Sequence, residues 1–594
     1  MKKALLITAL SVVSALVLTA QEHQITLMSS GQIPEDPFNP RVGWKLAIDV
    51  ANEADRTDCW IDWNNDGARS EDEAVTTFGT DGFVEHEMTS KIITLHGPIT
   101  QLIGNDNALI EMNLSKNPDL AVLICDNNLL TGLDVSHTPK INNLSVRQNP
   151  ITSIDLSGLS NLTRLGLAGT SLTTIDLSNN KLLEHIDLSY MNIGETLDLS
   201  GLSHLQSAGL FNMNLKHLNL SGCFSLTSLI APFNLFEELD LSDCPKITFL
   251  NLNNSLSGQI DLSNCTKLRT LSLELCGLKS IDLSPLTRLR NLDLFKNEIT
   301  SLDLSTVPLL EDLIVGGNPL TEIDLSKTPN LTYLHVSTSS QITSLDLSTL
   351  PQLKMLDAAK CAIANIDLSS LTALQDCNLS SNKLTTIDLS QNKALKAARI
   401  EENNLEEVTV GALPLLQELY VSQNKLSSLD VTGCKELKKL GIFSNNFSQE
   451  DTQRLINTLP KRSSKGSLYV IDSENPKEAN ICTSEQVAQL AEKGWTAYDW
   501  KGYKNYGQNP FAGNVAISPV YDNAIEISST PFPGVVYVKA PISSTIEIFD
   551  MTGTLIDSLT VQSEVSTISD LPVGVCFVRV TSGGQQTSAT VLVR

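Results

Sequence analysis

The sequence lacks the features that mark most enzymes and nucleic-acid-binding proteins. It has no H-E-x-x-H, G-x-S-x-G or C-x-x-C motif and no phosphate-binding loop, and its eight histidines are scattered. Basic residues are scarce, because 42 Lys and Arg face 67 Asp and Glu, for a formal net charge of −25. Because the catalytic motifs are missing, we expect no enzymatic activity. Because a polyanion of this kind is repelled by phosphate, we expect no nucleic-acid partner.

Membrane-spanning proteins and disulfide-stabilised proteins are also disfavoured by what the sequence lacks. Beyond the N-terminus no apolar run reaches the roughly 20 residues that span a bilayer. The cysteines number eleven and show no disulfide framework. Cys223, Cys244 and Cys265 lie one repeat apart, and Cys434 fills the same position later, where other repeats carry Leu or Val. Stacked side chains suit disulfide torsions poorly, so we interpret these as buried thiols that pack as small hydrophobes.

One repeated unit dominates what remains. From Ile99 to Phe447 the pattern L-x-x-L-x-L-x-x-N-x-L alternates with a shorter I-D-L-S segment, as in Leu162–Ser178 and Leu374–Ser390. There are seventeen repeats, with a step of 21 residues and two steps of 22. We therefore predict an α/β-type leucine-rich-repeat solenoid, mostly β with little helix, built around one parallel sheet. Repeat positions 1, 4, 6 and 11 should face inward, with a strand across positions 3 to 7.

Two polar positions recur within the repeat. Position 9 is often Asn, and an inward amide there can bond the backbone groups of its own and the next coil. The Asp of I-D-L-S should face outward on the opposite side, where neighbouring like charges repel. We expect the Ser two residues on to offset this repulsion through an Asx-type turn, with cation binding as the alternative.

The ends of the chain differ from the repeats. Residues 1–20 predict a secretory signal peptide, and residues 21–98 a β-rich N-terminal cap with strands at 45–50, 59–63 and 91–95. Residues 448–500 predict a cap of two helix–strand units, with helices at 450–459 and 484–493. Residues 501–513 are expected to be a linker and residues 514–594 a small antiparallel β-sandwich.

The repeats and both caps resemble internalin-like leucine-rich-repeat surface proteins of Gram-negative bacteria. The matching cap motifs are W-I-D-W-N-N-D-G at 60–67 and L-A-E-K-G-W-T-A-Y-D-W at 490–500. The last domain resembles the sorting domain of the type IX secretion system, on I-E-I-F-D-M-T-G at 546–553, D-L-P-V-G-V at 570–575 and a final strand ending at Arg594. This resemblance implies the type IX machinery as a partner, export to the outer-membrane surface or beyond, and sorting roles for Gly553, Leu571, Gly574 and Arg594.

One loop has the spacing of a calcium site. Its oxygens would come from Asp62, Asn64, Asp66, the Ala68 carbonyl and Glu73, with the sharp turn at Gly67. A strand precedes the loop, so it is no EF-hand. The alternatives are a calcium ion that stiffens the cap and a solvated acidic turn.

Large apolar side chains interrupt the polar outward face in two places. We expect exposed rings there either to bind a partner or to fold against their neighbours and cover the sheet. The first predicted patch is His185, Tyr190, Phe211, Ile230, Pro232, Phe233 and Phe249, and the second is Phe295, Ile314, Tyr333 and His335.

The sequence therefore predicts an exported adhesin that recognises a host-cell or bacterial surface protein, with roles in host attachment, virulence or biofilm formation. A glycan- or polymer-binding surface module is the main alternative. A structural surface-layer component and an enzyme are the others.

Overall fold

The computed structural model describes residues 23–31, 43–502 and 509–513, together with strands between 526 and 593. The predicted signal peptide lies outside the described residues. The chain forms two compact units, unit 1 up to Ile299 and unit 2 from Thr300, and each is described by itself. Among the described helices none is long and apolar enough to cross a bilayer.

The N-terminal cap of unit 1 is β-rich, as predicted, and continues into the repeat sheet. Its strands β3 (Trp60–Asp62), β5 (Ile92–His96), β1 (Gln24–Ser29) and β7 (Leu109–Lys116) form an antiparallel sheet in that order. Strand β2 (Gly43–Val50) pairs antiparallel with β4 (Phe83–Glu87) and with β6 (Ile99–Ile103), the first repeat strand. Short 3-10 helices at Glu53–Asp58 and Glu71–Glu73 complete the cap. The cap thus covers the first apolar coil.

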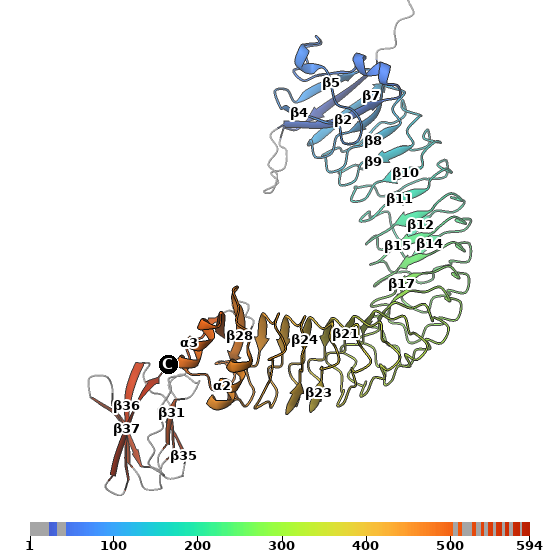
Figure 1. Ribbon diagram of the computed structural model, residues 1–594. Helices are drawn as coiled ribbons and strands as arrows, with labels where there is room; N and C mark the ends of the chain where they lie inside the picture. Colours follow the sequence, from blue (N-terminus) through green and yellow to red (C-terminus); the bar gives the residue numbers. More distant parts are fainter. Residues whose placement is uncertain are drawn as a thin grey trace, which may run out of the picture. The chain divides into compact units, whose positions relative to one another are not determined.

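Each repeat contributes one short strand to a parallel sheet (Figure 1). In unit 1 these strands, after β6, are β8 (Val122–Ile124), β9 (Asn143–Ser145), β10 (Arg164–Gly166), β11 (His185–Asp187), β13 (Ser207–Gly209), β15 (Ser228–Ile230), β16 (Phe249–Asn251), β17 (Thr270–Ser272) and β18 (Asn291–Asp293). In unit 2 they are β19 (Asp312–Ile314), β20 (Tyr333–His335), β21 (Met355–Asp357), β22 (Asp376–Asn378), β24 (Ala397–Arg399), β26 (Glu418–Tyr420) and β27 (Lys439–Gly441).

The strands are shorter than expected, while nearly all the inward positions are as predicted. Most span repeat positions 3 to 5 rather than 3 to 7. The chain starts to turn after position 5, and the residue at position 8 takes a left-handed backbone in nearly every repeat, as at Asn127 (φ 57°) and Gln423 (φ 55°). A left-handed residue cannot continue a strand. Positions 1, 4 and 6 are buried throughout and form the core with position 11. Position 11 departs from this in three repeats, where Ile193 is half-buried and Ser257 and Gln341 are exposed.

The position-9 asparagines form an internal ladder, as predicted, but they bond to the preceding coil rather than to the next one. Asn403 is typical: its Nδ2 donates to the carbonyls of Leu379 at 2.9 Å and Ile400 at 3.2 Å, and its Oδ1 accepts the N–H of Leu384 at 3.0 Å. Each amide therefore joins its own coil to the preceding one. Where Asn is absent, a smaller group makes part of the same link: the Ser255 hydroxyl donates to the Ala231 carbonyl at 2.6 Å.

The cysteines in the described residues are free and buried. Burial raises the pKa of the Cys223, Cys244 and Cys265 thiols to about 11, 12 and 11. The interpretation of this stack as buried thiols agrees with the structure.

These thiols are expected to be silent toward a thiol-reactive dye in the folded protein. The reagent attacks the thiolate, and both burial and the raised pKa suppress it. We expect labelling at mildly alkaline pH to begin only as urea unfolds the chain. Fast labelling of Cys244 in the native protein, located by peptide mapping, would contradict the buried stack.

The outward aspartates of I-D-L-S close Asx-type turns, as predicted. Asp261 Oδ1 accepts the N–H of Ser263 at 2.9 Å, and the same contact recurs in most repeats. The segments are extended but form strands in only two places, β12 (Thr196–Asp198) with β14 (His217–Asn219) and β23 (Thr386–Asp388) with β25 (Glu407–Thr409). The serine N–H and then its hydroxyl lower the pKa of many of these carboxyls, which are Asp176, Asp240, Asp261, Asp282, Asp324 and Asp367.

The aspartate turns are expected to make the solenoid acid-sensitive. A folded-state pKa below the unfolded value of 3.8 stabilises the fold above that pH, and this stabilisation is lost as the pH falls through the lowered pKa. The aspartate turns should therefore make the midpoint of urea unfolding fall steeply as the pH drops below the unfolded pKa of these carboxyls. A midpoint that stays constant into strong acid would contradict these turns.

The C-terminal cap extends the parallel sheet of unit 2, as predicted. Helix α2 (Gln449–Thr458) leads to β28 (Gly466–Ile471), and helix α3 (Ser484–Glu492) leads to β29 (Trp495–Asp499). Strand β28 pairs parallel with β27, and β29 pairs parallel with β28. The short β30 (Asn509–Pro510) then adds antiparallel to β29.

A buried carboxylate ties this cap to the last repeat. Glu478 is 5% exposed and accepts the backbone N–H groups of Ser444 at 2.8 Å, Asp472 at 2.6 Å and Asn480 at 2.9 Å. Burial raises the pKa of Glu478 to about 7. The Glu478 side chain thus joins the cap to the last repeat through backbone hydrogen bonds, as the asparagine ladder joins one coil to another.

The C-terminal region contains two antiparallel sheets. One has the order β31 (Glu526–Ser529), β32 (Val536–Lys539), β35 (Val565–Ile568). The other has the order β34 (Leu555–Thr560), β33 (Thr545–Phe549), β36 (Gly574–Ser582), β37 (Gln585–Val593). The predicted antiparallel β-fold of this region is therefore present.

Candidate functional site

The outward sheet face of unit 1 presents its side chains in aligned rows. Parallel pairing of β9, β10 and β11 holds these strands in register, so residues of equal repeat position lie side by side. Position 3 contributes Asn143, Arg164 and His185, and position 5 contributes Ser145, Gly166 and Asp187. Strand β13 continues the second row with Gly209, and β15 with Ile230.

An aromatic ladder stands beside these rows, made of Tyr190, Phe211 and Phe233 from three consecutive coils. The ring centroids of Tyr190 and Phe211 are 4.9 Å apart, and those of Phe211 and Phe233 are 5.2 Å apart. Tilted pairs at these separations are favourable, at about 0.5–1.5 kcal/mol each. Tyr190 nevertheless remains 55% exposed and Phe233 46% exposed. The contacts between the rings fix their positions and leave much of their surface open to solvent.

Two rings of the aromatic ladder sit on strained backbone. Tyr190 has φ 61° and Phe233 has φ 58°, in the left-handed region. An L-residue with a bulky side chain is held there at a cost of about 1–2 kcal/mol, whereas Asn and Gly tolerate it. Some other repeats place Asn127, Gly169 or Asn254 at this position, and others place larger residues such as Leu275 or Lys296. The bulky rings are thus exposed at positions that disfavour them.

A hollow of about 530 Å³ opens on the same face beside the aromatic ladder. It extends over strands β8 to β15, and both His185 and Ile230 line it. Gly166 and Gly209 carry no side chain at the outward positions of β10 and β13, which leaves the face low at these points. The polar side chains that line the hollow around these glycines include Asn143, Ser145 and Ser189.

One arginine crosses the floor of this hollow. Arg147 Nε lies 2.8 Å from Asp187 Oδ2, in an ion pair that spans the intervening strand β10. A Cβ at Gly166 would stand 3.0 Å from Arg147 Cζ and Nε and 2.6 Å from Ser145 Oγ. Only glycine therefore lets this side chain lie flat across the strand. Asp126 holds the near end, since its Oδ1 accepts the Ser145 hydroxyl at 2.6 Å and the Arg147 N–H at 2.8 Å.

Arg164 is in a different state from Arg147. It is exposed, and its guanidinium has no hydrogen-bond or ion-pair partner in the part of the chain that the structure describes. His185 next to it is half-buried, and burial and the Arg164 charge lower the pKa of this imidazole. The hollow therefore contains one paired arginine, one unpaired arginine and a neutral histidine.

The structure revises the membership of the first predicted patch. Tyr190, Phe211, Ile230 and Phe233 lie together on the outward face, with Ile230 38% exposed, and His185 and Phe249 are half-buried. Pro232 is buried, so its predicted contribution to the exposed patch is wrong. Its carbonyl accepts the N–H of Asn212 from the preceding coil at 2.9 Å.

The second predicted patch is divided between the two units. In unit 1, Phe295 is half-buried, and the Lys296 ammonium lies 5.0 Å from its ring centroid. In unit 2, Ile314, Tyr333 and His335 are half-buried on neighbouring strands. His335 Nε2 lies 2.6 Å from Ser337 Oγ and its ring is stacked on Tyr333. Neither part exposes rings as the aromatic ladder does.

A further aromatic group lies at the end of the sheet in unit 2. Tyr420 and Phe443 of the repeats are joined there by Tyr469, Tyr498 and Trp500 of the cap. The Phe443 and Trp500 rings stack with centroids 5.2 Å apart, and Tyr469 lies 5.5 Å from Tyr498. The alternation in W-T-A-Y-D-W was the available signal, because it places Tyr498 and Trp500 on one side of β29. Tyr469 and Phe443 are buried, so this group mainly covers the end of the sheet.

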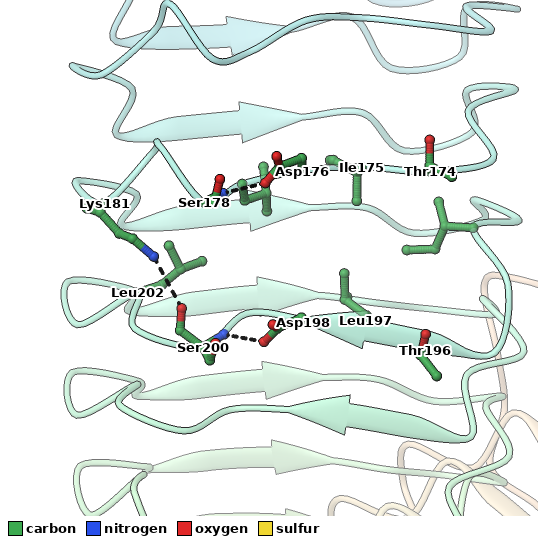
Figure 2. A pocket seen from close by; sticks show the side chains of 12 residues that line it. Thr174, Ile175, Asp176, Ser178, Lys181, Thr196, Leu197, Asp198, Ser200 and Leu202 are labelled. Carbon is green, nitrogen blue, oxygen red and sulfur yellow. Dashed lines mark hydrogen bonds between the residues drawn. The ribbon is translucent and has the colours of Figure 1, made fainter.

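A second hollow, of about 330 Å³, lies on the opposite side of the coil (Figure 2). It opens where the longer repeat starting at Leu183 separates Ile175 from Leu197. Its charged groups already have partners: Asp176 and Asp198 accept the N–H of the serine two residues on, and Lys181 Nζ donates to the Ser200 carbonyl at 3.4 Å (Figure 2).

The predicted calcium loop forms a compact turn in the N-terminal cap. Both Asp62 oxygens accept loop N–H groups, from Asp66 at 3.1 Å and Gly67 at 2.8 Å. Asn64 Oδ1 also accepts the Asp66 N–H at 2.9 Å, and Asp66 Oδ1 accepts that of Ala68 at 2.8 Å. Glu73 is buried and accepts the Ser70 N–H at 2.8 Å. Backbone amides therefore satisfy this loop in the structure, and calcium binding stays a prediction.

Three of the four predicted sorting residues lie outside the part of the chain that the structure describes. Gly553, Leu571 and Arg594 are outside the described residues, and Gly574 begins strand β36.

The stacked parallel strands, the buried leucines and the asparagine ladder define the solenoid as a leucine-rich-repeat fold. Residues 509–594 match the family described as the secretion system C-terminal sorting domain. The chain thus carries a sorting domain at its C-terminus, as predicted, and this domain marks the protein for export. No curated protein matches the sequence.

Solved structures agree on the repeat fold. A leucine-rich-repeat protein of Leptospira interrogans is 20% identical, with 61% of this chain and 97% of that chain covered and a TM-score of 0.51. The Toll–Spätzle complex of Drosophila matches at 15% identity, 71% and 63% coverage and a TM-score of 0.50. The functional domain of InlJ from Listeria monocytogenes, described as including a cysteine ladder, matches at 22% identity, 84% and 93% coverage and a TM-score of 0.47.

Proposed function

We propose that this chain is an exported surface adhesin that binds a protein on a host cell or a neighbouring bacterium through the outward sheet face of unit 1. The aromatic ladder carries the proposal. Tyr190 and Phe233 are exposed and sit on backbone that disfavours them, so they contribute little to folding. Other repeats also have a left-handed residue at this position, so the exposure of the two rings is what distinguishes them.

The energetics of the aromatic ladder suit recognition. Aromatic side chains dominate protein interfaces, where single rings contribute about 2 kcal/mol or more. The Tyr190, Phe211 and Phe233 rings already contact one another on a rigid sheet, so little side-chain freedom is lost on binding. A partner therefore meets a surface that is arranged in advance.

Export and display support the same function. The sorting domain matched at residues 509–594 marks the chain for secretion, which gives the solenoid access to partners outside the cell. A long, regular sheet face suits a protein surface, which contacts many side chains at once. The hydrogen-bonding groups beside the rings also suit a sugar, so a glycan ligand is the outcome to test against.

The test compares intact target cells with cells whose surface proteins have been removed by protease. The full chain should bind intact host or bacterial cells, lose that binding after protease treatment, and show no signal on a glycan array. A variant with Phe211→Ala and Phe233→Ala should bind neither the intact cells nor the protease-treated cells. Binding that survives protease and appears on the array would replace the protein partner by a glycan, and intact binding by the variant would remove the aromatic ladder from the site.

A further inference from the structure

We infer that the hollow beside the aromatic ladder receives an acidic side chain, Asp or Glu, of the bound partner, with the Arg164 guanidinium as its counter-charge. This inference rests on the proposed function and names the chemistry that the site recognises. It follows from the one arginine of the hollow that contacts no carboxylate and from the shape that two glycines give the hollow.

The other charges of the hollow are already in use. Arg147 is paired with Asp187 at 2.8 Å, and its second carboxylate neighbour, Asp126, lies 3.7 Å away. Asp126 also accepts the Ser145 hydroxyl and the Arg147 N–H. Arg147 and the two carboxylates therefore contact one another across the floor, and Arg164 takes no part in these contacts.

Arg164 is the exception in this network. It is exposed, it has no partner among the described residues, and it lies between Asn143 and His185 on the aligned strands. A guanidinium presents a planar fork of donors that fits a carboxylate in two parallel hydrogen bonds.

The shape of the hollow admits a side chain rather than a bulky group. Its low points are Gly166 and Gly209, and Ile230 on its wall continues toward the aromatic ladder. When an acidic side chain of the partner reaches Arg164, the apolar residues next to it in the partner therefore lie over the aromatic ladder.

The experiment selects short random peptides displayed on phage with the full chain as bait. We expect selected sequences to place Asp or Glu beside apolar residues. Binding of a selected peptide should fall about tenfold to a hundredfold with Arg164→Gln, the weight of a charge-assisted pair. The same peptide with its acidic residue changed to the amide should bind the native chain as weakly as the original peptide binds the Arg164→Gln variant. Combining the two changes should weaken binding little further.

The control is Arg288→Gln, which removes the same charge from an exposed arginine elsewhere in unit 1. Selected peptides that need Phe211 and Phe233 but show no acidic preference, or that ignore Arg164→Gln, would overturn this inference and leave the proposed function standing. Selection of no peptide that depends on the aromatic ladder would overturn both.

Discussion

Replacing Tyr190 and Phe233 together by asparagine is expected to weaken partner binding about 100-fold or more without destabilising the fold. Two exposed rings at the centre of an interface contribute about 2 kcal/mol each, and this is what their removal costs. The backbone at both positions is left-handed, with φ near 60°. Asparagine adopts that conformation readily and occupies the same position at Asn212 and Asn254. Stability should therefore stay level or rise by up to about 1 kcal/mol.

Titration of the partner onto the immobilised full chain, beside urea unfolding of the same samples, measures both effects. Phe224→Ala is the matched control, because Phe224 is 52% exposed in unit 1 but lies outside the aromatic ladder. It should leave binding unchanged. A double variant that loses more than about 1 kcal/mol of stability and keeps its binding would show that the rings serve to cover the sheet.

The opposite directions of these two effects separate the competing interpretations of the rings. Rings kept for packing stabilise the fold, so their loss lowers the unfolding free energy. Rings kept for recognition, held on strained backbone, do the reverse. A measurement of stability alone thus distinguishes them before any partner is known.

The repeat pattern made most of the solenoid predictable. Inward leucines, the asparagine at position 9 and the aspartate turn each recur, so one physical argument covers many coils at once. The argument that Ser263 would satisfy Asp261 needed only their spacing, because an Asx turn is local. The caps were also predictable, since the helices and strands around Gln449–Thr458 and Trp495–Asp499 have clear periodicity.

The site was less predictable because it depends on side-chain direction across strands. Nothing in the sequence shows that Arg147 would lie over Gly166 to reach Asp187, since these residues are distant in the chain and the pairing depends on register and rotamer. The burial of Pro232 was missed for a similar reason, because repeat position alone does not determine how far a side chain is covered.

The strand lengths show a third limit of the sequence. Alternation predicted strands through position 7, yet most end at position 5 because the chain turns toward a left-handed residue at position 8. That conformation is occupied by residues as different as Lys296, Thr338 and Glu402. Residue type alone could not reveal it.

Replacing Asn445 by alanine is expected to lower the free energy of unfolding by about 3–5 kcal/mol, whereas Asn446→Ala should change it by no more than about 0.5 kcal/mol. Asn445 is 2% exposed. Its Nδ2 donates to the carbonyls of Val421 at 3.0 Å and Ile442 at 2.8 Å, and its Oδ1 accepts the N–H of Leu426 at 2.9 Å. Alanine leaves the Leu426 N–H without a partner, at about 1–3 kcal/mol. Each carbonyl loses one of its two amide bonds, at about 0.5–1.5 kcal/mol each, because Asn424 Nδ2 still donates to Val421 at 3.0 Å and Asn480 Nδ2 to Ile442 at 2.7 Å.

The neighbouring asparagine is a control of the same residue type in the same coil. Asn446 is exposed and makes one bond, from its Nδ2 to the Lys425 carbonyl at 3.2 Å, where water can replace it. A graded variant sharpens the comparison: Asn445→Ser should cost less than Asn445→Ala, because the Ser255 hydroxyl makes part of the same link in its own coil. Urea unfolding with hydrogen exchange would measure all three variants. Because each coil contacts only its neighbours, the lost protection should centre on the coils around Val421 and Leu426. Equal losses for Asn445→Ala and Asn446→Ala would mean that the internal ladder does not hold the coils together.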